Sequence, residues 1–507
     1  MTDATPAAPP QRSLKEQMAY GVAWMTAARL GIQVLGIMST MVLARLLTPE
    51  DFGLIAIAMS VVMLLDSLSQ FGFEVPLIQK QDATRDDYDT AWTLNIISAT
   101  AVAAALLIAA PFAARFYSEP RIEAILRWVA VGHLFMAFQN IGTVLFRKQM
   151  NFRRDFALQI AQKLAVMAIS IPLAFLLRSY WALVAGMVAG RVVGVAVSYG
   201  FLPYRPRLCL KAWRGLLDFS KWMQINGILI YVRDRGYVLV MGRLLDAPSV
   251  GLFTLADEIA SLPSTTLVAP LNRAVFPGFV RVSNDAAKLR ESYRSMLGLI
   301  ALIALPAAVG LAAVSALVVP VVLGSQWHAT IPLLTLLALA GASRILTAST
   351  VSVHYATAQP HLQTLTTGIQ AFTLIPMVML GVLQNGVIGA AWAYLLHSLL
   401  VFIPVAYWFL LRRTSIRLTD AWEPLWRPII AAAVMFAVVK PIANAWATPE
   451  AVLALRRLLL VVTGGALLYV TTAALLWWLS GRPAGAERVV LNRAGPLLRG
   501  LLGRSSS

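Results

Sequence analysis

The chain has 507 residues, of which 59% are hydrophobic and only 13% are charged. This balance is far from that of a soluble globular domain and indicates a membrane protein. The single cysteine, Cys209, excludes a disulfide framework. The formal net charge of +18 would suit a nucleic acid partner unless the positions of the basic residues explain it otherwise.

Apolar runs of about 20 residues, long enough to cross a hydrocarbon core about 30 Å thick, follow one another along the chain. Alternation with period two, which a membrane β-barrel requires, is absent from them. The pattern therefore predicts an all-α polytopic membrane protein with fourteen transmembrane helices. In chain order they cover 18–47, 52–79, 88–115, 121–146, 154–177, 180–204, 216–245, 249–280, 292–323, 328–357, 362–383, 386–411, 428–447 and 453–480.

The basic residues are divided unequally between the segments that alternate across the membrane. If 1–16 lies inside, the inner segments hold 27 Lys and Arg residues, the outer segments hold eight, and seven lie within the spans. This positive-inside bias predicts that both termini are cytoplasmic. The surplus charge is then topological, with some attraction to anionic membrane lipids, and no nucleic acid partner is expected. The polar N-terminal tail lacks a short apolar region with a cleavage site, so the first helix is expected to be retained.

One phrase occurs twice. ARLLTPEDFGLIAIA begins at Ala44 and GRLLDAPSVGLFTLA begins at Gly242; Arg45, Gly53 and, further upstream, Trp24 all recur 198 residues later. Six predicted helices lie between equivalent points, so both copies cross the membrane in the same direction. This predicts two parallel repeats related by an axis along the membrane normal, as in one class of secondary transporters.

The repeat predicts a division into two six-helix lobes followed by two extra helices. The expected segments are a cytoplasmic tail over 1–16, an N-lobe over 17–204, a cytoplasmic linker over 205–215, a C-lobe over 216–411, two extra helices over 412–480 and a basic cytoplasmic tail over 481–507.

The first copy of the phrase, together with FGFEVPLIQ and FRKQMNFRRDF further along, resembles the Wzx-type flippases. These form the polysaccharide-transport branch of the multidrug/oligosaccharidyl-lipid/polysaccharide exporters. The resemblance covers about residues 15–480. It implies two lobes that meet in a V, with helices 1, 2, 7 and 8 lining a central cavity. It also implies that an undecaprenyl-diphosphate-linked oligosaccharide is moved from the cytoplasmic to the periplasmic leaflet of a bacterial inner membrane, with a polysaccharide polymerase as a further partner.

Basic residues within the spans are the candidate ligands for such a headgroup. A charge at membrane depth is costly, so it normally faces protein or a wet cavity. Arginine presents a planar fork that matches phosphate oxygens and stays charged at any working pH. The headgroup candidates are Arg29, Lys163, Arg233, Arg235 and Arg344, whereas Arg127 and Arg191 lie close enough to span ends to reach the interface. Salt bridges between the lobes are the alternative role for the same residues.

Acidic residues within the spans are candidates for coupling transport to H+ or Na+. A carboxylate near arginines titrates or binds a cation according to the partner it faces, and static pairing is the alternative. Asp66 and Glu74 are expected on one stripe of helix 2, Asp234 on helix 7, and Asp257 and Glu258 on helix 8. Asp234 stands between two arginines, so at least one of these must pair with it or pack against another helix.

Several other chemistries are not expected. The five histidines show no HExxH or other metal-binding spacing, and no phosphate-cradling glycine loop occurs. No metal, cofactor or enzymatic activity is therefore predicted. The outer connections are short, which argues against a membrane glycosyltransferase that uses the same lipid carrier. A lipid II flippase and a cation-coupled multidrug antiporter of the sister branch remain alternatives.

Tryptophans near the outer ends of the spans and prolines in helix 8 also predict local structure. Trp181, Trp327 and Trp392 lie near outer ends, where an interfacial belt is favoured over sugar binding. Pro263 and Pro270 remove backbone donors and can kink helix 8.

Overall fold

The computed structural model describes residues 31–69, 73–80, 82–149, 152–202, 204–448, 451–483 and 485–488. Regular structure in these ranges is helical, without strands. Nine of the described helices are long and apolar enough to cross a membrane, or ten if one bent pair counts as a span. The prediction of an all-α polytopic membrane protein is therefore confirmed. The number is below fourteen partly because α10 has only 17 residues and because two predicted spans run together in 360–413.

The N-lobe is formed by six long helices, with three short ones between them. Two predicted helices are broken in it: 52–79 divides into α2 and α3, and 121–146 bends by 68° after α5. The second break follows from Asn140, whose side-chain oxygen accepts a hydrogen bond from the Gly142 amide at 2.9 Å and so competes with the helix. The elements are Gly31–Leu46, α2 (Pro49–Ser69), α3 (Glu74–Gln79), α4 (Arg85–Phe116), α5 (Arg121–Ala137), η1 (Ile141–Thr143), α6 (Val144–Lys148), α7 (Phe152–Leu177) and α8 (Trp181–Phe201).

The C-lobe follows the same order with more interruptions. Its elements are α9 (Trp213–Leu244), α10 (Ala247–Pro263), η2 (Ser264–Val268), α11 (Ala269–Val282), α12 (Ala286–Ala313), α13 (Ser315–Val322), η3 (Ser325–Trp327), α14 (Thr330–Leu346), α15 (Ala348–Ala356), α16 (Pro360–His397), η4 (Ser398–Phe402) and α17 (Ile403–Arg413). The two extra helices are α18 (Leu418–Ala445) and α19 (Ala451–Leu479).

Two interruptions in the C-lobe have clear local causes. Directly after Pro263 the eighth predicted helix changes to a π-helical turn, η2, which fits the kink expected at that proline. Within α16, Gly386 has a φ of +57°, so the chain reverses between the eleventh and twelfth predicted helices. The two arms are so close that a Cβ on Gly381 would lie 2.3 Å from the Gly389 carbonyl oxygen.

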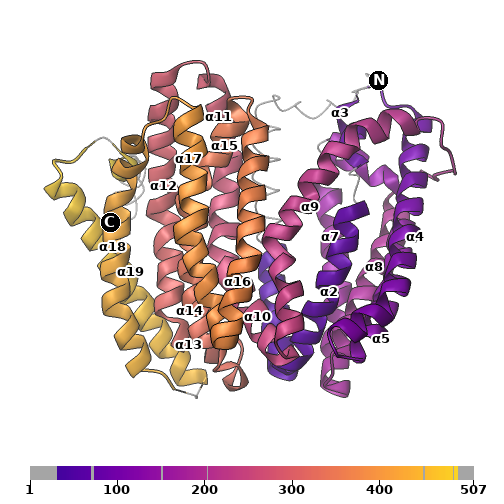
Figure 1. Ribbon diagram of the computed structural model, residues 1–507, viewed down its shortest axis with the longest axis horizontal. Helices are drawn as coiled ribbons and strands as arrows, with labels where there is room; N and C mark the ends of the chain where they lie inside the picture. The colour runs from indigo at the N-terminus through magenta and orange to yellow at the C-terminus, as the bar shows by residue number, and fades with distance from the viewer. Residues whose placement is uncertain are drawn as a thin grey trace, which may run out of the picture.

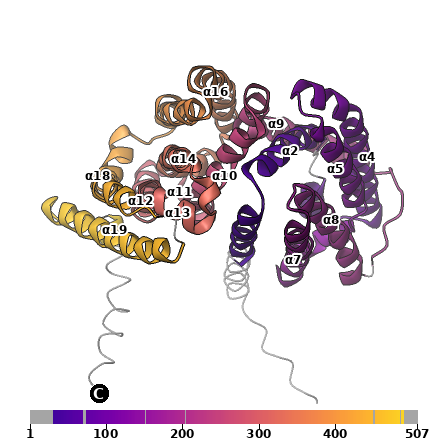
Figure 2. The ribbon, with the colours of Figure 1, turned by 90° about the horizontal axis from the view of Figure 1, so that it is seen from below.

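The helices form two groups side by side, with the N-terminal indigo and purple helices on the right of Figure 1 and the orange and yellow ones on the left. Seen from below, α2, α9 and α10 lie between the two groups (Figure 2), and α2 packs on both α9 and α10. Helices α18 and α19 pack on the outside of the C-lobe, where α18 contacts α12.

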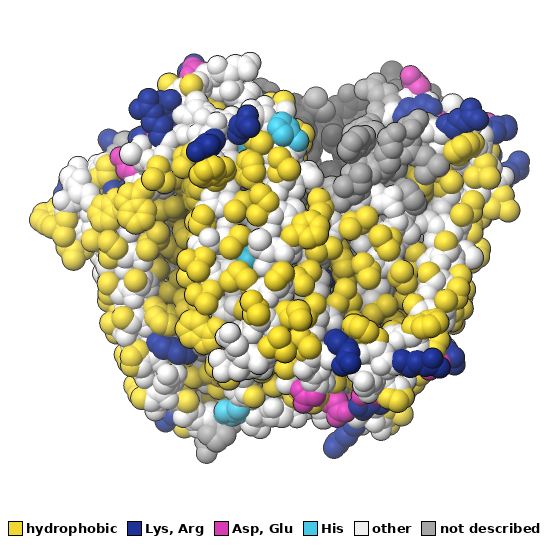
Figure 3. All heavy atoms as spheres, viewed as in Figure 1, with side chains coloured by type: hydrophobic (Ala, Val, Ile, Leu, Met, Phe, Trp, Pro, Cys, Tyr) yellow, Lys and Arg dark blue, Asp and Glu magenta, His cyan; other side chains and the backbone are white. Residues whose placement is uncertain are grey.

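The two ends of the bundle differ. We call the end with the connections α9–α10 and α13–α14 the closed end, and the end with the connections α8–α9 and α11–α12 the basic end. The basic end is at the top of Figure 3. Hydrophobic side chains cover the middle of the visible face, and lysines and arginines lie mainly toward its two ends, as expected for a protein surrounded by lipid.

At the closed end the lobes meet through the repeated phrase itself. Helices α2 and α10 begin at Pro49 and Ala247, which are equivalent residues of the repeat, and they approach backbone to backbone. A Cβ on Gly53 would lie 1.7 Å from the Ala247 oxygen, and a Cβ on Gly251 would lie 1.9 Å from the Pro49 oxygen. We call these four residues the glycine contact. Its reciprocity explains why glycine occurs at the same place in both copies: no side chain fits at either position.

The repeated arginines also reach across to the other lobe. Arg45 donates from Nη2 to the Val321 carbonyl at 2.5 Å, and the Arg243 guanidinium lies 5.8 Å from the ring centre of Phe116 on α4. Each copy of the phrase therefore binds the opposite lobe.

Trp327 corrects the expectation of an interfacial belt. It is fully buried, and its indole Nε1 donates to the Ala44 carbonyl at 2.7 Å. It also meets Phe52 edge to face, with ring centres 5.4 Å apart. The closed end is thus sealed by a tryptophan of the C-lobe that is inserted against the N-lobe.

We predict that Gly53→Ala and Gly251→Ala each destabilise the protein by about 1–3 kcal/mol, because the added methyl group overpacks a backbone contact. The measurement is the midpoint of thermal unfolding of the purified protein in detergent. Gly368→Ala is the matched control, since a Cβ there meets nothing within 4 Å and alanine favours the helix by up to about 1 kcal/mol. Equal midpoints for all three variants would contradict the close approach of α2 and α10.

Candidate functional site

Most of the charged candidate residues within the spans fall into three groups. One lies between the lobes, one is buried inside the C-lobe, and one is inside the N-lobe. Arg29 lies outside the described residues.

The first group, which we call the interlobe cluster, consists of Lys163, Arg235 and Glu258. They come from α7, α9 and α10, so Lys163 belongs to the N-lobe and the other two to the C-lobe. Glu258 interacts electrostatically with both cations and is itself exposed. Lys163 Nζ would lie 3.5 Å from a Cβ on Gly36, so the ammonium group sits beside the first helix. The cluster thus joins charged side chains of both lobes around one carboxylate.

Arg233 is directed differently from Arg235. Its Nε donates to Asp234 Oδ1 at 2.7 Å, and its Nη1 lies 3.5 Å from Thr367 Oγ1 on α16. Arg233 thus makes the pairing with Asp234 that the three consecutive charges require. Of the two adjacent arginines, Arg235 is the one that attracts Glu258, and it is also attracted by Asp257 and Asp234.

The second group, the C-lobe network, holds Arg344 within the C-lobe. Arg344 Nη2 donates to Tyr394 Oη at 2.6 Å, and Tyr237 Oη donates to Asp257 Oδ2 at 2.8 Å. Tyr237, Tyr394 and Asp257 are all buried, and the two tyrosine rings stack edge to face. Arg344 is also attracted by Asp257 and Asp234. These contacts favour a structural role for Arg344 and Asp257.

The third group, the N-lobe triad, surrounds Asp66 on α2. His133 Nε2 on α5 lies 3.2 Å from Asp66 Oδ1. Arg191 on α8 interacts electrostatically with the same carboxylate, and its Nη1 donates to the Val129 carbonyl at 3.1 Å. Arg191 therefore points into the lobe, although its position in the sequence would also allow it to reach the interface.

Glu74 does not belong with Asp66. Because α2 ends at Ser69 and Glu74 begins α3, the two residues are not on one continuous helical stripe, and that expectation was wrong. Glu74 is exposed and accepts a hydrogen bond from Arg147 Nη1 at 2.7 Å. It lies with Arg147 on the short helices of the basic end, where an exposed ion pair contributes little.

Two further hydrogen bonds cross between the lobes. Tyr231 Oη donates to the Ser60 carbonyl at 2.7 Å, and Gln33 Nε2 donates to Thr266 Oγ1 at 2.7 Å. Thr266 lies in the π-helical turn η2, so the first helix is tied to the irregular part of the eighth span. In the part of the chain that the structure describes, no group of three His, Cys, Asp or Glu side chains is arranged to hold a metal ion.

The sequence identified charged residues of the site but not the side chains that they contact. It singled out Asp66 but not His133 and Arg191 as its neighbours, and Arg344 but not its bond to Tyr394. The signal available for the first set was the placement of His133 and Arg191 within predicted spans of the same lobe. Nothing in the sequence pointed to Tyr394.

Comparison with known proteins gives relatives along most of the chain. A family model described as "Polysaccharide biosynthesis protein" matches residues 42–332. The lipopolysaccharide biosynthesis protein WzxC of Escherichia coli (strain K12) is 26% identical over 396 residues, covering 76% of this chain and 80% of that protein. The succinoglycan biosynthesis transport protein ExoT of Rhizobium meliloti (strain 1021) is 25% identical over 448 residues, covering 86% and 88%.

Solved structures agree on the fold. The lipid II flippase MurJ, in an inward closed conformation, matches with a TM-score of 0.71 at 13% identity, over 90% of this chain and 99% of that one. A multidrug transporter of the MATE family, in an inward-facing conformation, matches with a TM-score of 0.57 at 12% identity, over 76% and 99%. At such identities the likeness concerns the fold alone. Because the family model spans more than half of the chain, this protein belongs to the polysaccharide biosynthesis protein family.

Proposed function

We propose that this protein moves a polyprenyl-diphosphate-linked oligosaccharide, most simply an undecaprenyl-diphosphate-linked repeat unit, from the cytoplasmic to the periplasmic leaflet by alternating access. The observation that carries the proposal is the interlobe cluster, in which a lysine of the N-lobe and an arginine of the C-lobe both attract Glu258. The relatives WzxC and ExoT are named for lipopolysaccharide and succinoglycan biosynthesis, which supports a polysaccharide precursor as the cargo.

The cluster suggests how the headgroup is bound and released. Without cargo, Glu258 shares the field of Lys163 and Arg235. A diphosphate entering between the lobes replaces Glu258 as their anionic partner, and the guanidinium of Arg235 offers paired donors to its oxygens. Since Lys163 belongs to one lobe and Arg235 to the other, a bridging diphosphate draws the lobes together at this depth. The glycine contact then has to open at the other end for the cargo to leave.

We predict that Arg235→Ala lowers glycan export by tenfold or more, because a charge-assisted contact to the headgroup contributes about 1.5–3 kcal/mol. Arg235→Lys should restore only part of the rate, since a point charge replaces a planar fork. The measurement is the rate of export of the glycan in a strain that lacks the native gene. Arg127→Ala is the matched control, because Arg127 pairs with Glu123 on the exposed face of α5.

A salt-bridge role for Arg235 leads to a different result. If Arg235 only balances Glu258, the double variant Arg235→Gln with Glu258→Gln should recover full export. If Arg235 binds the headgroup, the double variant should stay as slow as Arg235→Gln, because the diphosphate still lacks its donor. Normal export by Arg235→Ala would remove this residue from the mechanism.

The N-lobe triad supports a proton as the coupling ion. Asp66 faces His133 and Arg191, so a metal cation at this carboxylate would meet the arginine charge at close range. A proton instead neutralises Asp66 without entering as a separate charge, and it releases Arg191 and His133 from their partner. This favours H+ over Na+ for the coupling step.

We predict that Asp66→Asn slows export and flattens its dependence on the proton gradient, because an amide cannot take up the proton. Export should be measured with the gradient intact and after it is collapsed with a protonophore. The control is Asp86→Asn, since Asp86 forms an exposed pair with Lys211 outside the lobe interior. Retention of the wild-type response to the gradient in Asp66→Asn would leave Asp66 with a structural role, and a response to Na+ instead would exclude the proton.

The charge bias along the sequence supports an inner-membrane protein whose basic end faces the cytoplasm. The single Cys209 lies in the α8–α9 connection at that end. We predict that a membrane-impermeant thiol reagent labels Cys209 only after the cells are permeabilised. In a Cys209→Ser background, Ser325→Cys in the exposed α13–α14 connection should be labelled on intact cells. The reverse pattern would invert the topology.

The experiment that tests the function as a whole is deletion of the gene. The proposed role requires a lipid-linked glycan to accumulate on the cytoplasmic leaflet of the deletion strain and to disappear on complementation. Accumulation of lipid II instead would assign the chain to peptidoglycan synthesis.

A further inference from the structure

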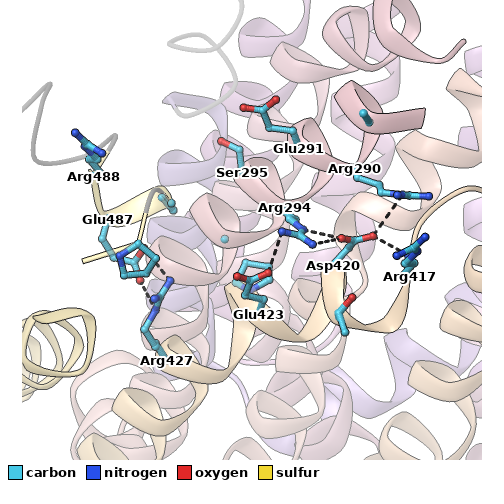
Figure 4. A pocket seen from close by; sticks show the side chains of 17 residues that line it. Arg290, Glu291, Arg294, Ser295, Arg417, Asp420, Glu423, Arg427, Glu487 and Arg488 are labelled. Atoms are coloured by element: carbon cyan, nitrogen blue, oxygen red, sulfur yellow. Dashed lines mark hydrogen bonds and ion pairs between the residues drawn. The ribbon is translucent and has the colours of Figure 1, made fainter. Parts of the chain in front are cut away.

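A second polar cavity lies at the basic end, away from the space between the lobes. It has a volume of about 570 Å³ and is lined by one face of α12, the first turns of α18 and the segment 483–488 that follows α19. Figure 4 shows its charged side chains, which include five arginines and four carboxylates. The lining therefore has a net charge of one positive unit, which matches the single negative charge of a phosphodiester.

Most of the charges in this cavity hold its walls together. The buried Asp420 accepts a hydrogen bond from Arg294 Nε at 2.6 Å, and Arg294 Nη1 lies 3.0 Å from Glu423. Arg427 and Glu487 form an almost fully buried pair at 2.9 Å, which ties the C-terminal segment to α18. These pairs link the three walls before any ligand is present, so the cavity is a built site with fixed geometry.

Two arginines on the rim of the cavity take no part in these ion pairs. Arg417 and Arg488 are both exposed, and neither guanidinium forms an ion pair with a carboxylate among the described residues; the Arg417 backbone amide donates to Asp420 Oδ2 at 2.8 Å (Figure 4). Arg290 Nε donates to the Ser415 carbonyl at 2.7 Å and lies 3.9 Å from Asp420 Oδ2. The rest of its guanidinium therefore stays available to a ligand. Guanidinium groups at such a place present forked donors to phosphate oxygens.

An apolar groove continues from this cavity along α18. It is lined by Trp422, Trp426 and Ile430 and shares Thr419 and Glu423 with the cavity. Trp422 is 60% exposed and Ile430 is 42% exposed. The spacing of these residues places them on one stripe of the helix, which runs away from the arginines. Indole rings at such a boundary pack well against acyl chains near the headgroup level.

We propose that this cavity and groove bind one anionic glycerophospholipid, with its phosphodiester at Arg290 and Arg417, which lie beside each other at one end of the cavity (Figure 4), and an acyl chain along Trp422 and Trp426. A cationic cavity that opens into an apolar aromatic groove is complementary to an amphiphile, whereas a free phosphate would use only half of it. Basic cavities between membrane helices on the cytoplasmic side are suited to such headgroups. The site is separate from the interlobe cluster, and it does not depend on the proposed transport function.

The test uses tryptophan quenching in vesicles and does not measure transport. The full-length protein is placed in phosphatidylcholine vesicles that contain increasing fractions of phosphatidylglycerol with brominated acyl chains, since bromine quenches a tryptophan that it contacts. The fluorescence of Trp422 is obtained as the difference between the unmodified protein and Trp422→Phe. We expect brominated phosphatidylglycerol to quench half of this fluorescence at a mole fraction about tenfold lower than brominated phosphatidylcholine does. The reason is that each arginine near the headgroup contributes about 1 kcal/mol to the binding of an anionic lipid.

The double variant Arg290→Gln with Arg417→Gln should lose this preference and quench equally with both lipids. The matched control, Arg281→Gln with Arg413→Gln, removes two exposed charges from the same end but none from the cavity and should keep it. Equal quenching by both lipids in the unmodified protein would overturn the proposal, as would loss of the preference in the control.

Competition identifies the source of the phosphate. Unlabelled phosphatidylglycerol should reverse the quenching, and inorganic phosphate at millimolar concentration should not. Reversal by inorganic phosphate would show that the groove contributes nothing and would overturn the assignment of a lipid. Reversal by a polyprenyl diphosphate but not by phosphatidylglycerol would replace the phospholipid with the lipid carrier and equally contradict the proposal.

Discussion

The glycine contact sets the geometry on which the rest of the molecule depends. At Gly53 and Gly251 the lobes touch backbone to backbone, so their distance at the closed end has almost no freedom. Arg45, Arg243 and Trp327 add bonds around the same place and seal it. This contact holds together the two lobes whose helices α7, α9 and α10 carry the interlobe cluster.

Burial sorts the charges of the spans into different roles. Arg344 and Asp257 have hydrogen-bonded partners inside the C-lobe, so they stabilise that lobe internally. Lys163, Arg235 and Glu258 come from both lobes, and in the proposed alternating-access cycle the boundary between them has to open. A charge pair between moving bodies stabilises one state only, whereas a pair inside one body stabilises both. Arginines and carboxylates thus stabilise one lobe in the C-lobe network, whereas in the interlobe cluster we propose that they exchange partners.

The sequence predicted the class of fold and the importance of the repeated phrase, because both depend on local composition and on identities at a fixed offset. It could not predict the breaks at Asn140 and Gly386, where one side chain or one left-handed residue redirects a helix that is otherwise uniformly apolar. Trp327 was assigned to the wrong environment because a lipid interface and a lobe interface select the same residue type. The partners of Asp66 lie on α5 and α8, and which helix faces meet is decided by packing across the whole lobe.

The reciprocity of the glycine contact has an evolutionary consequence. Pro49 meets Gly251 and Ala247 meets Gly53, which is the pattern of an isologous two-fold interface, where residue i touches j and j touches i. In this protein both halves of that interface are covalently joined in one chain. A contact made by backbone atoms requires glycine at only these two positions, so it holds while the two lobes diverge elsewhere. This is the geometry expected of a six-helix homodimer whose gene was duplicated and fused, after which one lobe was free to acquire Arg235 and Glu258 and the other Lys163.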